Sequence, residues 1–558
     1  MSSYFKCEDI KNIIPIPEPG NKSFADFYLD QIDKFPSSWF LDEGRNEKLL
    51  FSELSSRIRR FSSNILHKGY KKGHTICIFS QNCNNFVVSL IGCSLAHVTC
   101  KTANPTYTGH ELKYQLEFSD ASAILIGSNL LSTLEDALKL CKEENKSPQI
   151  KEIFVLESSE DVQNIPTLLH GIPVYLFETL LKQPDGPFLE PESLLDPKTD
   201  TWIRPFSSGT TGLPKGVELT HYNMLSNVYQ FAQYKNLFNF SQNSTMIGVL
   251  PLYHLYGLYI YAICCPMRGG NVVLQPEFKP VSFLMAIQKH RATHVYIVPP
   301  LALFISKDPR VKDYDITNVE DVISAAAPFA TDTAAGFSDK MKELGSKDVV
   351  VRQAWGMTEL SPLALAGRLD DPDSRKLMGS LGDVLPMTEV KLVDLETGGV
   401  VENGREGEIC VRGPQVMKGY YKNEEATRST IDADGWLHSG DIAKYENSQF
   451  LITDRIKELI KTKGEQVAPA ELEGILLTHP SIQDCCVFGL PHPKLGEAPS
   501  AAVVLKPGQN MSERELKSFV SSKVAPYKQL AGGVRFIDVI PKTASGKILR
   551  RILRARYL

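Results

Sequence analysis

Alternating strand-like and helix-like segments in the first half of the chain constrain its fold most strongly. Apolar runs at residues 74–80, 122–127 and 151–156 predict buried strands, and residues 85–98 predict a mostly apolar helix between the first two. Polar helical stretches separate the later strands. Because strands that alternate with helices form parallel sheets covered by helices, we expect an α/β fold.

Later segments divide the chain into further parts. Residues 281–298 predict an amphipathic helix followed by a strand, which continues the α/β pattern. In residues 384–412, short strands at 389–393 and 408–412, separated by glycine and asparagine turns, predict a small β-rich subdomain. Beyond Asp454, strands at 484–489 and 501–505 and helices at 470–479 and 512–523 predict a small α+β unit. We therefore predict a large N-terminal domain, residues 1–453, and a small C-terminal domain, residues 454–558.

The composition is that of an ordinary globular protein. Hydrophobic residues make up 42% and charged residues 23% of the 558 residues. The net charge of −4 gives no basic footprint, so we expect no nucleic-acid partner. The longest uncharged apolar run, residues 258–267, is shorter than the ~20 residues of a membrane-spanning helix, so we expect no transmembrane segment. The N-terminus shows no apolar signal region.

Cysteine usage indicates a reducing compartment. The eleven cysteines include no CxxC pair, and the neighbours Cys264–Cys265 and Cys485–Cys486 lie in apolar runs, which predicts buried thiols. We therefore expect a cytoplasmic protein. The C-terminal leucine is not preceded by Ser-Lys, so a peroxisomal address is the weaker alternative. The sequence shows no evident Ser-His-Asp triad and no Cys/His metal cluster.

One glycine-rich stretch, residues 207–216, is suited to binding a polyphosphate. It holds four hydroxyls, three glycines and one lysine. Glycines let the backbone approach a ligand closely, and successive backbone N–H groups form an anion-binding concavity. The spacing is not that of the kinase and GTPase P-loop. The candidates for phosphate binding are Ser207, Ser208, Gly209, Thr210, Thr211, Gly212 and Lys215.

A second polar stretch follows a predicted strand at residues 349–352. Ligands bind at strand ends in open α/β sheets. Trp355 could stack on an adenine ring, Thr358 could donate to a phosphate oxygen, and Glu359 could hold Mg²⁺. The candidates in this stretch are Gln353, Ala354, Trp355, Gly356, Thr358 and Glu359.

Three segments nearer the C-terminus carry further candidates. Asp441 follows a glycine, and a carboxylate there can accept both hydroxyls of a ribose. Residues 454–466 form a run of charges, and Lys547 follows a Ser-Gly turn. The candidates in the run of charges are Arg455, Lys457, Lys461, Lys463, Gly464 and Gln466.

Together these motifs resemble the adenylate-forming superfamily. Five of them occur in superfamily order between about Thr102 and Arg551. The resemblance is greatest to the acyl-CoA synthetase branch, which includes 4-coumarate–CoA ligases and beetle luciferases. A run typical of that branch extends over residues 466–473.

The resemblance implies a two-step reaction that uses ATP, Mg²⁺ and coenzyme A. A small carboxylic acid attacks the α-phosphorus of ATP to give acyl-AMP, and the thiol of coenzyme A then takes the acyl group. The C-terminal domain resembles a mobile lid that brings Lys547 for the first step and Lys461 with Gln466 for the second. The resemblance also places His254 beside the acyl carboxylate, Arg455 at the ribose and Lys457 at the hinge.

Departures from the family pattern bear on the substrate. Ile260 stands where plant coumarate ligases carry a small polar residue, so we expect an aliphatic acyl group rather than a hydroxycinnamate. Ala354 and Trp355 replace a usual glycine and tyrosine. The residues that we assign to the acyl pocket are His254, Tyr256, Ile260, Ala325 and Ala326.

Other functions share these motifs. A luciferase-like oxygenase and an aromatic acid–CoA ligase would carry the same signatures. An inactive protein that binds acyl groups or nucleotides is a third possibility, although the presence of Lys215, Glu359, Asp441 and Lys547 argues against it.

Overall fold

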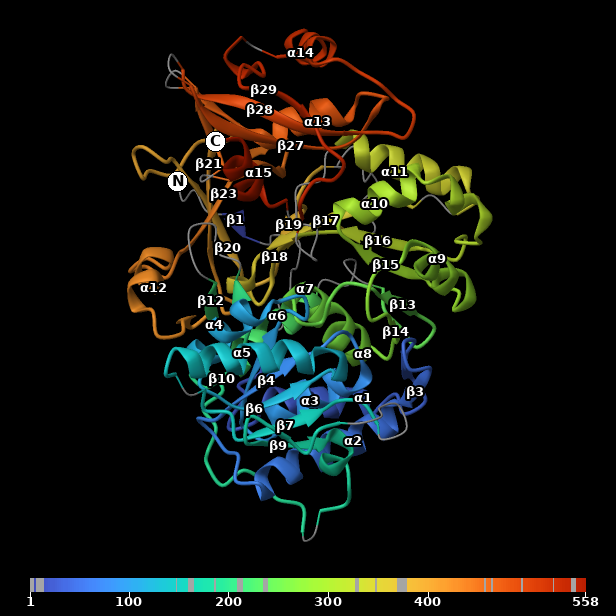
Figure 1. Ribbon diagram of the computed structural model, residues 1–558, viewed down its shortest axis with the longest axis vertical. Coiled ribbons are helices and arrows are strands. Elements are labelled where there is room, and N and C mark those ends of the chain that lie inside the picture. The colour runs from blue at the N-terminus through green and yellow to red at the C-terminus, as the bar shows by residue number, and fades with distance from the viewer. Residues whose placement is uncertain are drawn as a thin grey trace.

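The computed structural model contains four β-sheets among the residues that it describes (Figure 1). For residues 331, 332, 454, 455, 461, 465 and 466 it describes the backbone alone. The described residues are 5–6, 15–146, 148–158, 165–184, 187–207, 214–233, 239–326, 331–346, 349–368, 379–455, 458–462, 465–492, 495–524, 526–542 and 548–558.

The first sheet has a parallel centre, as the alternating pattern predicts. Along β4, Ile76 and Ile78 face the core beneath helices α2 and α3, whereas Cys77 and Phe79 face α4 and α5 on the other side. The helices are α2 (Phe51–His67), α3 (Asn84–Leu95), α4 (Gly109–Ser119) and α5 (Leu131–Glu143). In spatial order the strands are β11 (Phe206–Ser207), β12 (Lys215–Thr220), β10 (Thr201–Arg204), β5 (Thr99–Ala103), β4 (Thr75–Phe79), β6 (Ala121–Ile126), β7 (Glu152–Val155), β9 (Ile172–Leu176) and β8 (Leu168–Leu169), with β22 (Gly419–Tyr420) beside β12.

The second sheet is also parallel at its centre, from β2 to β17. Its strands, in spatial order, are β19 (Asp383–Val384), β18 (Leu363–Ala366), β17 (Val351–Gly356), β16 (Asp321–Ser324), β15 (His294–Ile297), β13 (Thr245–Gly248), β14 (Asn271–Leu274), β2 (Trp39–Asp42) and β3 (Glu47–Leu50). The accompanying helices are α9 (Pro280–Lys289), α10 (Pro299–Lys307) and α11 (Thr331–Glu343).

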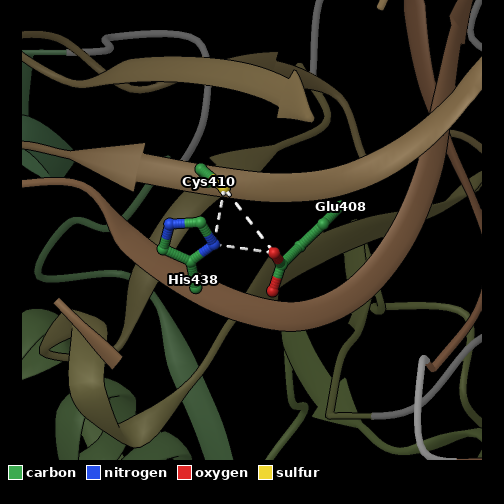
Figure 2. A group of neighbouring side chains, drawn as sticks. All are labelled: Glu408, Cys410 and His438. Carbon is green, nitrogen blue, oxygen red and sulfur yellow. Dashed lines mark hydrogen bonds and ion pairs between the residues drawn. The ribbon is translucent and has the colours of Figure 1, made fainter. Parts of the chain in front are cut away.

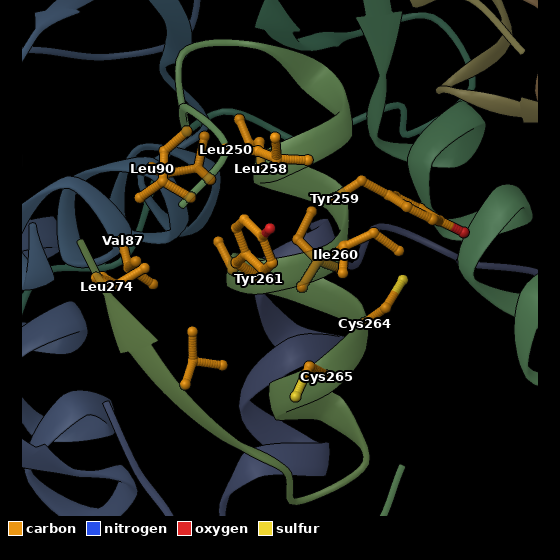
Figure 3. Packing of buried hydrophobic residues seen from close by; sticks show 14 of the residues in the cluster. Val87, Leu90, Leu250, Leu258, Tyr259, Ile260, Tyr261, Cys264, Cys265 and Leu274 are labelled. Atoms are coloured by element: carbon orange, nitrogen blue, oxygen red, sulfur yellow. The ribbon is translucent and has the colours of Figure 1, made fainter. Parts of the chain in front are cut away.

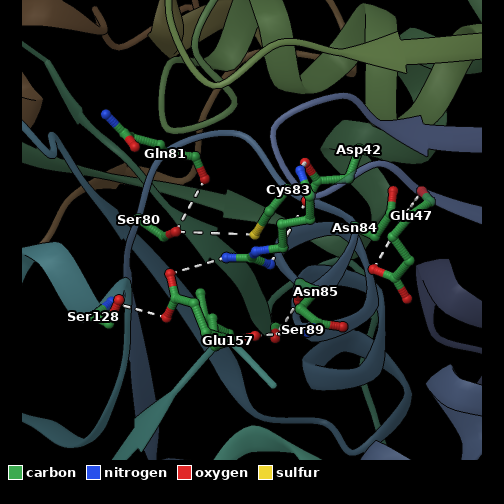
Figure 4. A network of polar contacts seen from close by, with 12 residues as sticks. Asp42, Glu47, Ser80, Gln81, Cys83, Asn84, Asn85, Ser89, Ser128 and Glu157 are labelled. Atoms are coloured by element: carbon green, nitrogen blue, oxygen red, sulfur yellow. Dashed lines mark hydrogen bonds and ion pairs between the residues drawn. The ribbon is translucent and has the colours of Figure 1, made fainter. Parts of the chain in front are cut away.

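One hydrophobic core joins the two large sheets. It contains Ile78 of the first sheet, Val273 of the second, and side chains of the helices α1 (Phe24–Ile32), α6 (His221–Gln233) and α8 (Cys265–Met267). Polar contacts at the same junction fix the position of β2 (Figure 4). Arg45 donates to Glu157 Oε1 at 3.0 Å and lies 3.6 Å from Asp42 Oδ2. Because burial outweighs this pairing, the pKa of Asp42 rises to about 6.

The third sheet is antiparallel and confirms the β-rich subdomain. Its strands are β1 (Phe5–Lys6), β20 (Glu389–Val393), β21 (Glu406–Arg412), β23 (Leu437–Glu446) and β24 (Gln449–Arg455), with α12 (Glu424–Thr430) alongside. The strand predicted at residues 389–393 coincides with β20. The N-terminal strand β1, which pairs with β20, was not predicted from the sequence.

The fourth sheet is built from residues near the C-terminus (red and orange, top of Figure 1). The strands predicted at residues 484–489 and 501–505 are longer, because they form one antiparallel hairpin that runs from Ile482↔Leu505 to His492↔Gly496. The strands are β25 (Ile460–Thr462), β26 (Glu465–Val467), β27 (Ile482–His492), β28 (Gly496–Leu505) and β29 (Gly533–Phe536). Helices α13 (Pro469–Leu477) and α14 (Glu513–Ser521) cover one face, and α15 (Arg550–Tyr557) covers the other.

The predicted domain boundary at 453/454 falls within β24, which ends at Arg455. The next sheet begins at Ile460, so the change from one sheet to the other lies between these two residues. The division into two domains itself stays a prediction.

The structure also bears on the cysteines and on the apolar character of the helices. Ten cysteines are described, and all ten are free and buried, including the neighbours at 264–265 and 485–486. Among the described helices none combines the length and the apolar character needed to cross a bilayer.

A buried ion pair holds the centre of the second sheet together. Arg352 on β17 contacts both carboxylate oxygens of Asp321 on β16 at 2.6 Å, and both residues are buried. The Tyr296 hydroxyl on β15 donates to Asp321 Oδ2 at 2.7 Å. The pair thus ties three neighbouring parallel strands.

We expect Arg352→Ala to lower the free energy of unfolding by about 3–5 kcal/mol, because it leaves the Asp321 carboxylate buried without its cation. Urea denaturation measures this change. The matched control is Arg428→Ala, which removes an ion pair exposed by 73% and 88% and should cost no more than about 1 kcal/mol. Equal losses in the two variants would contradict this role for the buried pair.

Candidate active site

The turn after β17 places the predicted polar stretch at the carboxyl edge of the second sheet. β17 ends at Gly356, and a short 3₁₀ turn then holds Thr358 and Glu359. A Cβ atom on Gly356 would lie 1.9 Å from the carbonyl oxygen of Pro362, so only glycine fits there. Gln353 and Ala354 precede it as buried members of the strand.

A small pocket opens beside this turn, and both His254 and Thr358 line it. His254 Nδ1 accepts the backbone N–H of Tyr256 at 3.3 Å, which orients the imidazole ring. The neutral ring then carries its proton on Nε2. The remaining lining residues are Thr102, Asn104, Tyr107, Pro205, Phe206, Tyr253 and Leu255.

Lys215 and Glu359 are connected through Tyr420. The Lys215 Nζ atom lies 4.7 Å from the centre of the Tyr420 ring, and the Tyr420 hydroxyl donates to Glu359 Oε1 at 2.8 Å. Strand pairing produces this contact, because β12 carries Lys215 and pairs with β22, which carries Tyr420. The same β12 pairs with β11, so Ser207 lies opposite Lys215 across the glycine-rich loop. The loop's cation and the candidate magnesium ligand therefore belong to one site.

Trp355 and Asp441 also meet. The Trp355 indole Nε1 donates to Asp441 Oδ2 at 2.9 Å, and both side chains are buried. Asp441 stands opposite Arg455 in the pairing of β23 with β24, so the two predicted ribose contacts are neighbours. The hydrogen bond fixes the carboxylate that the sequence assigns to the ribose.

The predicted acyl-pocket residues fall into two places. The Tyr256 hydroxyl lies 3.4 Å from the carbonyl oxygens of Ile297 and Ile323, at the ends of β15 and β16. Ala325 and Ala326 follow β16 directly, and Ala326 has a left-handed φ of 70°. Ile260 instead lies in the π-helical segment Leu258–Cys264, inside the packed core and 3% exposed (Figure 3).

Several predicted residues lie outside the described residues. For Arg455, Lys461 and Gln466 only the backbone is described, and it pairs Lys461 with Gln466 across the β25–β26 hairpin. The candidates outside the described residues are Ser208, Gly209, Thr210, Thr211, Gly212, Lys457, Lys463, Gly464 and Lys547.

The sequence did not predict a role for Lys101, which is fully buried beneath the site. Its Nζ donates to the Gln115 carbonyl oxygen at 2.7 Å and lies 4.8 Å from the Phe206 ring centre. Burial, together with the nearby Arg204, lowers its pKa to about 8. One feature of the sequence could have indicated it, because Lys101 is the single charged residue in the strand Thr99–Ala103.

The sequence also gave no indication of a cluster formed by Glu408, Cys410 and His438 (Figure 2). The sequence showed no evident Cys/His metal cluster, and it did not suggest this group of one glutamate, one cysteine and one histidine, which could hold a metal ion. The cluster escaped notice because His438 comes 28 residues after Cys410, and the register of β21 against β23 brings them face to face.

Comparisons with known proteins find related sequences over almost the whole chain. The AMP-binding enzyme family matches residues 29–421, and the C-terminal domain of AMP-binding enzymes matches residues 471–547. The chain is 36% identical over 553 residues to the probable 4-coumarate–CoA ligase 1 of Dictyostelium discoideum, which covers 97% of this chain and 96% of that protein. It is 36% identical over 545 residues to the 4-coumarate–CoA ligase of Vanilla planifolia, which covers 96% and 94%.

Solved structures show the same fold. The o-succinylbenzoate CoA synthetase of Bacillus subtilis, in complex with its acyl-adenylate intermediate, superposes with a TM-score of 0.76 at 26% identity and covers 94% of this chain and 97% of its own. The anthranilate CoA ligase AuaEII, in complex with anthranoyl-AMP, gives a TM-score of 0.83 at 21% identity and covers 98% of each chain. The chain therefore belongs to the adenylate-forming superfamily of AMP-binding enzymes, in its acyl-CoA synthetase branch.

We expect Lys101→Met to alter how stability depends on pH. Below pH 8 the lysine is protonated in both the folded and the unfolded protein, and burying its charge lowers the stability of the folded state. Between pH 8 and about 10.5 the folded state loses this proton while the unfolded state keeps it, so stability rises with pH. Wild type should therefore gain up to ~3 kcal/mol relative to Lys101→Met between pH 7 and pH 10.

Paired urea denaturation curves of the two proteins at pH 7, 8, 9 and 10 measure this difference. Subtracting the free energy of unfolding of the variant from that of wild type at each pH removes the contribution of the other lysines and of the tyrosines, which titrate alike in both proteins. A difference that stays constant with pH would contradict a lowered pKa for Lys101.

Proposed function

We propose that the chain is an ATP-dependent carboxylate–CoA ligase. In the first step a carboxylate oxygen bonds to the α-phosphorus of ATP and pyrophosphate leaves, which gives acyl-AMP. In the second step the sulfur of coenzyme A bonds to the acyl carbon, AMP leaves with the electron pair, and the thiol loses its proton. The observation that carries this proposal is the pocket that holds His254 and Thr358 beside the contact of Lys215, Tyr420 and Glu359.

The described residues have separate tasks in this reaction. His254 and Thr358 line the pocket in which the carboxylate meets the α-phosphate, and Lys215 brings a positive charge to the phosphates. Asp441, held by the Trp355 indole, accepts the ribose hydroxyls. Both steps build negative charge on oxygen, so donors fixed in advance supply much of the stabilisation.

Glu359 fits the magnesium ion that this chemistry requires. Its carboxylate is buried, and an anionic oxygen is the kind of donor that Mg²⁺ prefers. The Tyr420 hydroxyl orients this carboxylate through Oε1, and Glu359 would hold the ion. When bound, the ion would neutralise charge on the phosphates of ATP.

Two classes of acid are candidates for the acyl group. Ile260 gave the reason to expect an aliphatic acid, but its side chain lies in the packed core rather than among the residues that line the pocket. The pocket is lined by the aromatic residues Tyr107, Phe206 and Tyr253, and the relatives at 36% identity are named 4-coumarate–CoA ligases. These observations support the aromatic acids, which the sequence left open as the alternative, so the aliphatic acids and the hydroxycinnamates both remain candidates.

A substrate panel tests the proposal. The purified protein is incubated with ATP, Mg²⁺, coenzyme A and either aliphatic acids of increasing chain length or hydroxycinnamates. We expect release of AMP and pyrophosphate together with an acyl-CoA for one of the two classes. Light emission with luciferin would support the oxygenase alternative, and no turnover across the whole panel would contradict the ligase proposal.

We expect Lys547→Ala to separate the two steps. Loss of a positive charge that acts only in adenylation should lower ATP–pyrophosphate exchange by about 10²–10³-fold. Transfer of the acyl group from supplied acyl-AMP to coenzyme A should stay within a few-fold of wild type, because the resemblance assigns Lys547 to the first step.

The control is Lys528→Ala, which removes a lysine near the C-terminus whose Nζ lies 2.7 Å from Glu471 Oε2. It should leave both activities unchanged. Equal adenylation by wild type and Lys547→Ala would show that Lys547 has no part in this step.

A further inference from the structure

Glu408, Cys410 and His438 form a compact group on the antiparallel sheet (Figure 2). Glu408 and Cys410 lie two residues apart on β21, and the strand register places Cys410 opposite His438 on β23. His438 Nδ1 lies 2.7 Å from Glu408 Oε2 and 3.4 Å from Cys410 Sγ, and the sulfur lies 4.0 Å from the same carboxylate oxygen.

These distances suit one zinc ion. A single point lies about 2.0 Å from all three atoms, and zinc is bound at about 2.0–2.2 Å by nitrogen and carboxylate oxygen and at about 2.3 Å by sulfur. That point lies in the plane of the three atoms, whereas a tetrahedral ion sets its ligand atoms about 3.3–3.6 Å apart, so binding would part His438 Nδ1 from Glu408 Oε2 and draw Cys410 Sγ closer, each by about half an ångström. A thiolate, an imidazole and a carboxylate are the donors that zinc uses in proteins, whereas magnesium prefers oxygen alone.

The neighbouring groups orient each ligand atom. The backbone N–H of Gly440 donates to Glu408 Oε1 at 2.9 Å, so Oε2 faces the other two ligands. His438 Nε2 lies 3.7 Å from Asp432 Oδ2, so a carboxylate stands near the far nitrogen of the ring. The Cys410 thiol is buried against Trp436 and Val393, while the His438 side chain is 33% exposed and gives access from solvent.

We propose that Glu408, Cys410 and His438 bind one thiophilic divalent cation, with Zn²⁺ preferred over Mg²⁺. The fourth coordination position is filled by water. Binding releases the proton of the Cys410 thiol and, when the imidazole is protonated, the proton on His438 Nδ1. Affinity for the ion therefore increases with pH.

The site is connected to the nucleotide pocket through the backbone. Gly440 has a left-handed φ of 72° where β23 bulges, and the Glu408 carboxylate holds this bulge through the Gly440 N–H. The next residue is Asp441, which bonds Trp355.

Titration of the full-length protein with Co²⁺ tests the site without ATP or an acid, so the result does not depend on the proposed ligase activity. We expect one Co²⁺ per chain, a cobalt–thiolate charge-transfer absorption, and displacement of Co²⁺ by Zn²⁺ but not by Mg²⁺. Cys410→Ser should abolish the absorption. His438→Gln should weaken Co²⁺ binding by at least about 100-fold. Asp432→Asn, which changes only a neighbour of the His438 ring, should weaken Co²⁺ binding by about 10–100-fold.

The matched control is Cys141→Ser. Cys141 Sγ lies 3.9 Å from Glu117 Oε1, so this variant removes another buried thiol beside a carboxylate. It should bind Co²⁺ as wild type does. Absence of the absorption in wild type, or wild-type affinity in folded Cys410→Ser and Asp432→Asn, would overturn the proposal.

Discussion

The hydrogen bond from the Trp355 indole to Asp441 is the interaction on which the arrangement of the site depends. Trp355 belongs to β17 of the large parallel sheet, and Asp441 belongs to β23 of the antiparallel sheet. Both side chains are buried, so the bond forms in a medium that strengthens it. Residues that would touch ribose and residues that would touch phosphate are thereby held on two sheets at a fixed separation.

Much of the fold could be predicted from the sequence because local pattern and tertiary structure agree. The apolar run at 74–80 contains β4, and the strand predicted at 389–393 has the same bounds as β20. The predicted strands were shorter than β27 and β28, because Gly489 and Pro499 are residue types that commonly end a strand. Ten residue pairs across the hairpin outweigh that local signal.

The site could be predicted only where one short segment carries several chemical groups. The segment around Thr358 and Glu359 could be recognised as a unit. Tyr420 could not, because it reaches Glu359 only through the pairing of β22 with β12. The same limit applies to His438 and Cys410, which lie on different strands. Ile260 is the opposite case: its position in the family pattern assigned it to the acyl pocket, but its side chain packs in the core.

The long hairpin of β27 and β28 has a mechanical consequence. Hydrophobic side chains cover both of its faces, so the C-terminal sheet resists bending. Each strand extends over about 35 Å at 3.3 Å per residue. The hairpin is therefore stiff, and a rotation of the C-terminal sheet as one unit by about 10° would carry its far end through about 6 Å while leaving its own register intact.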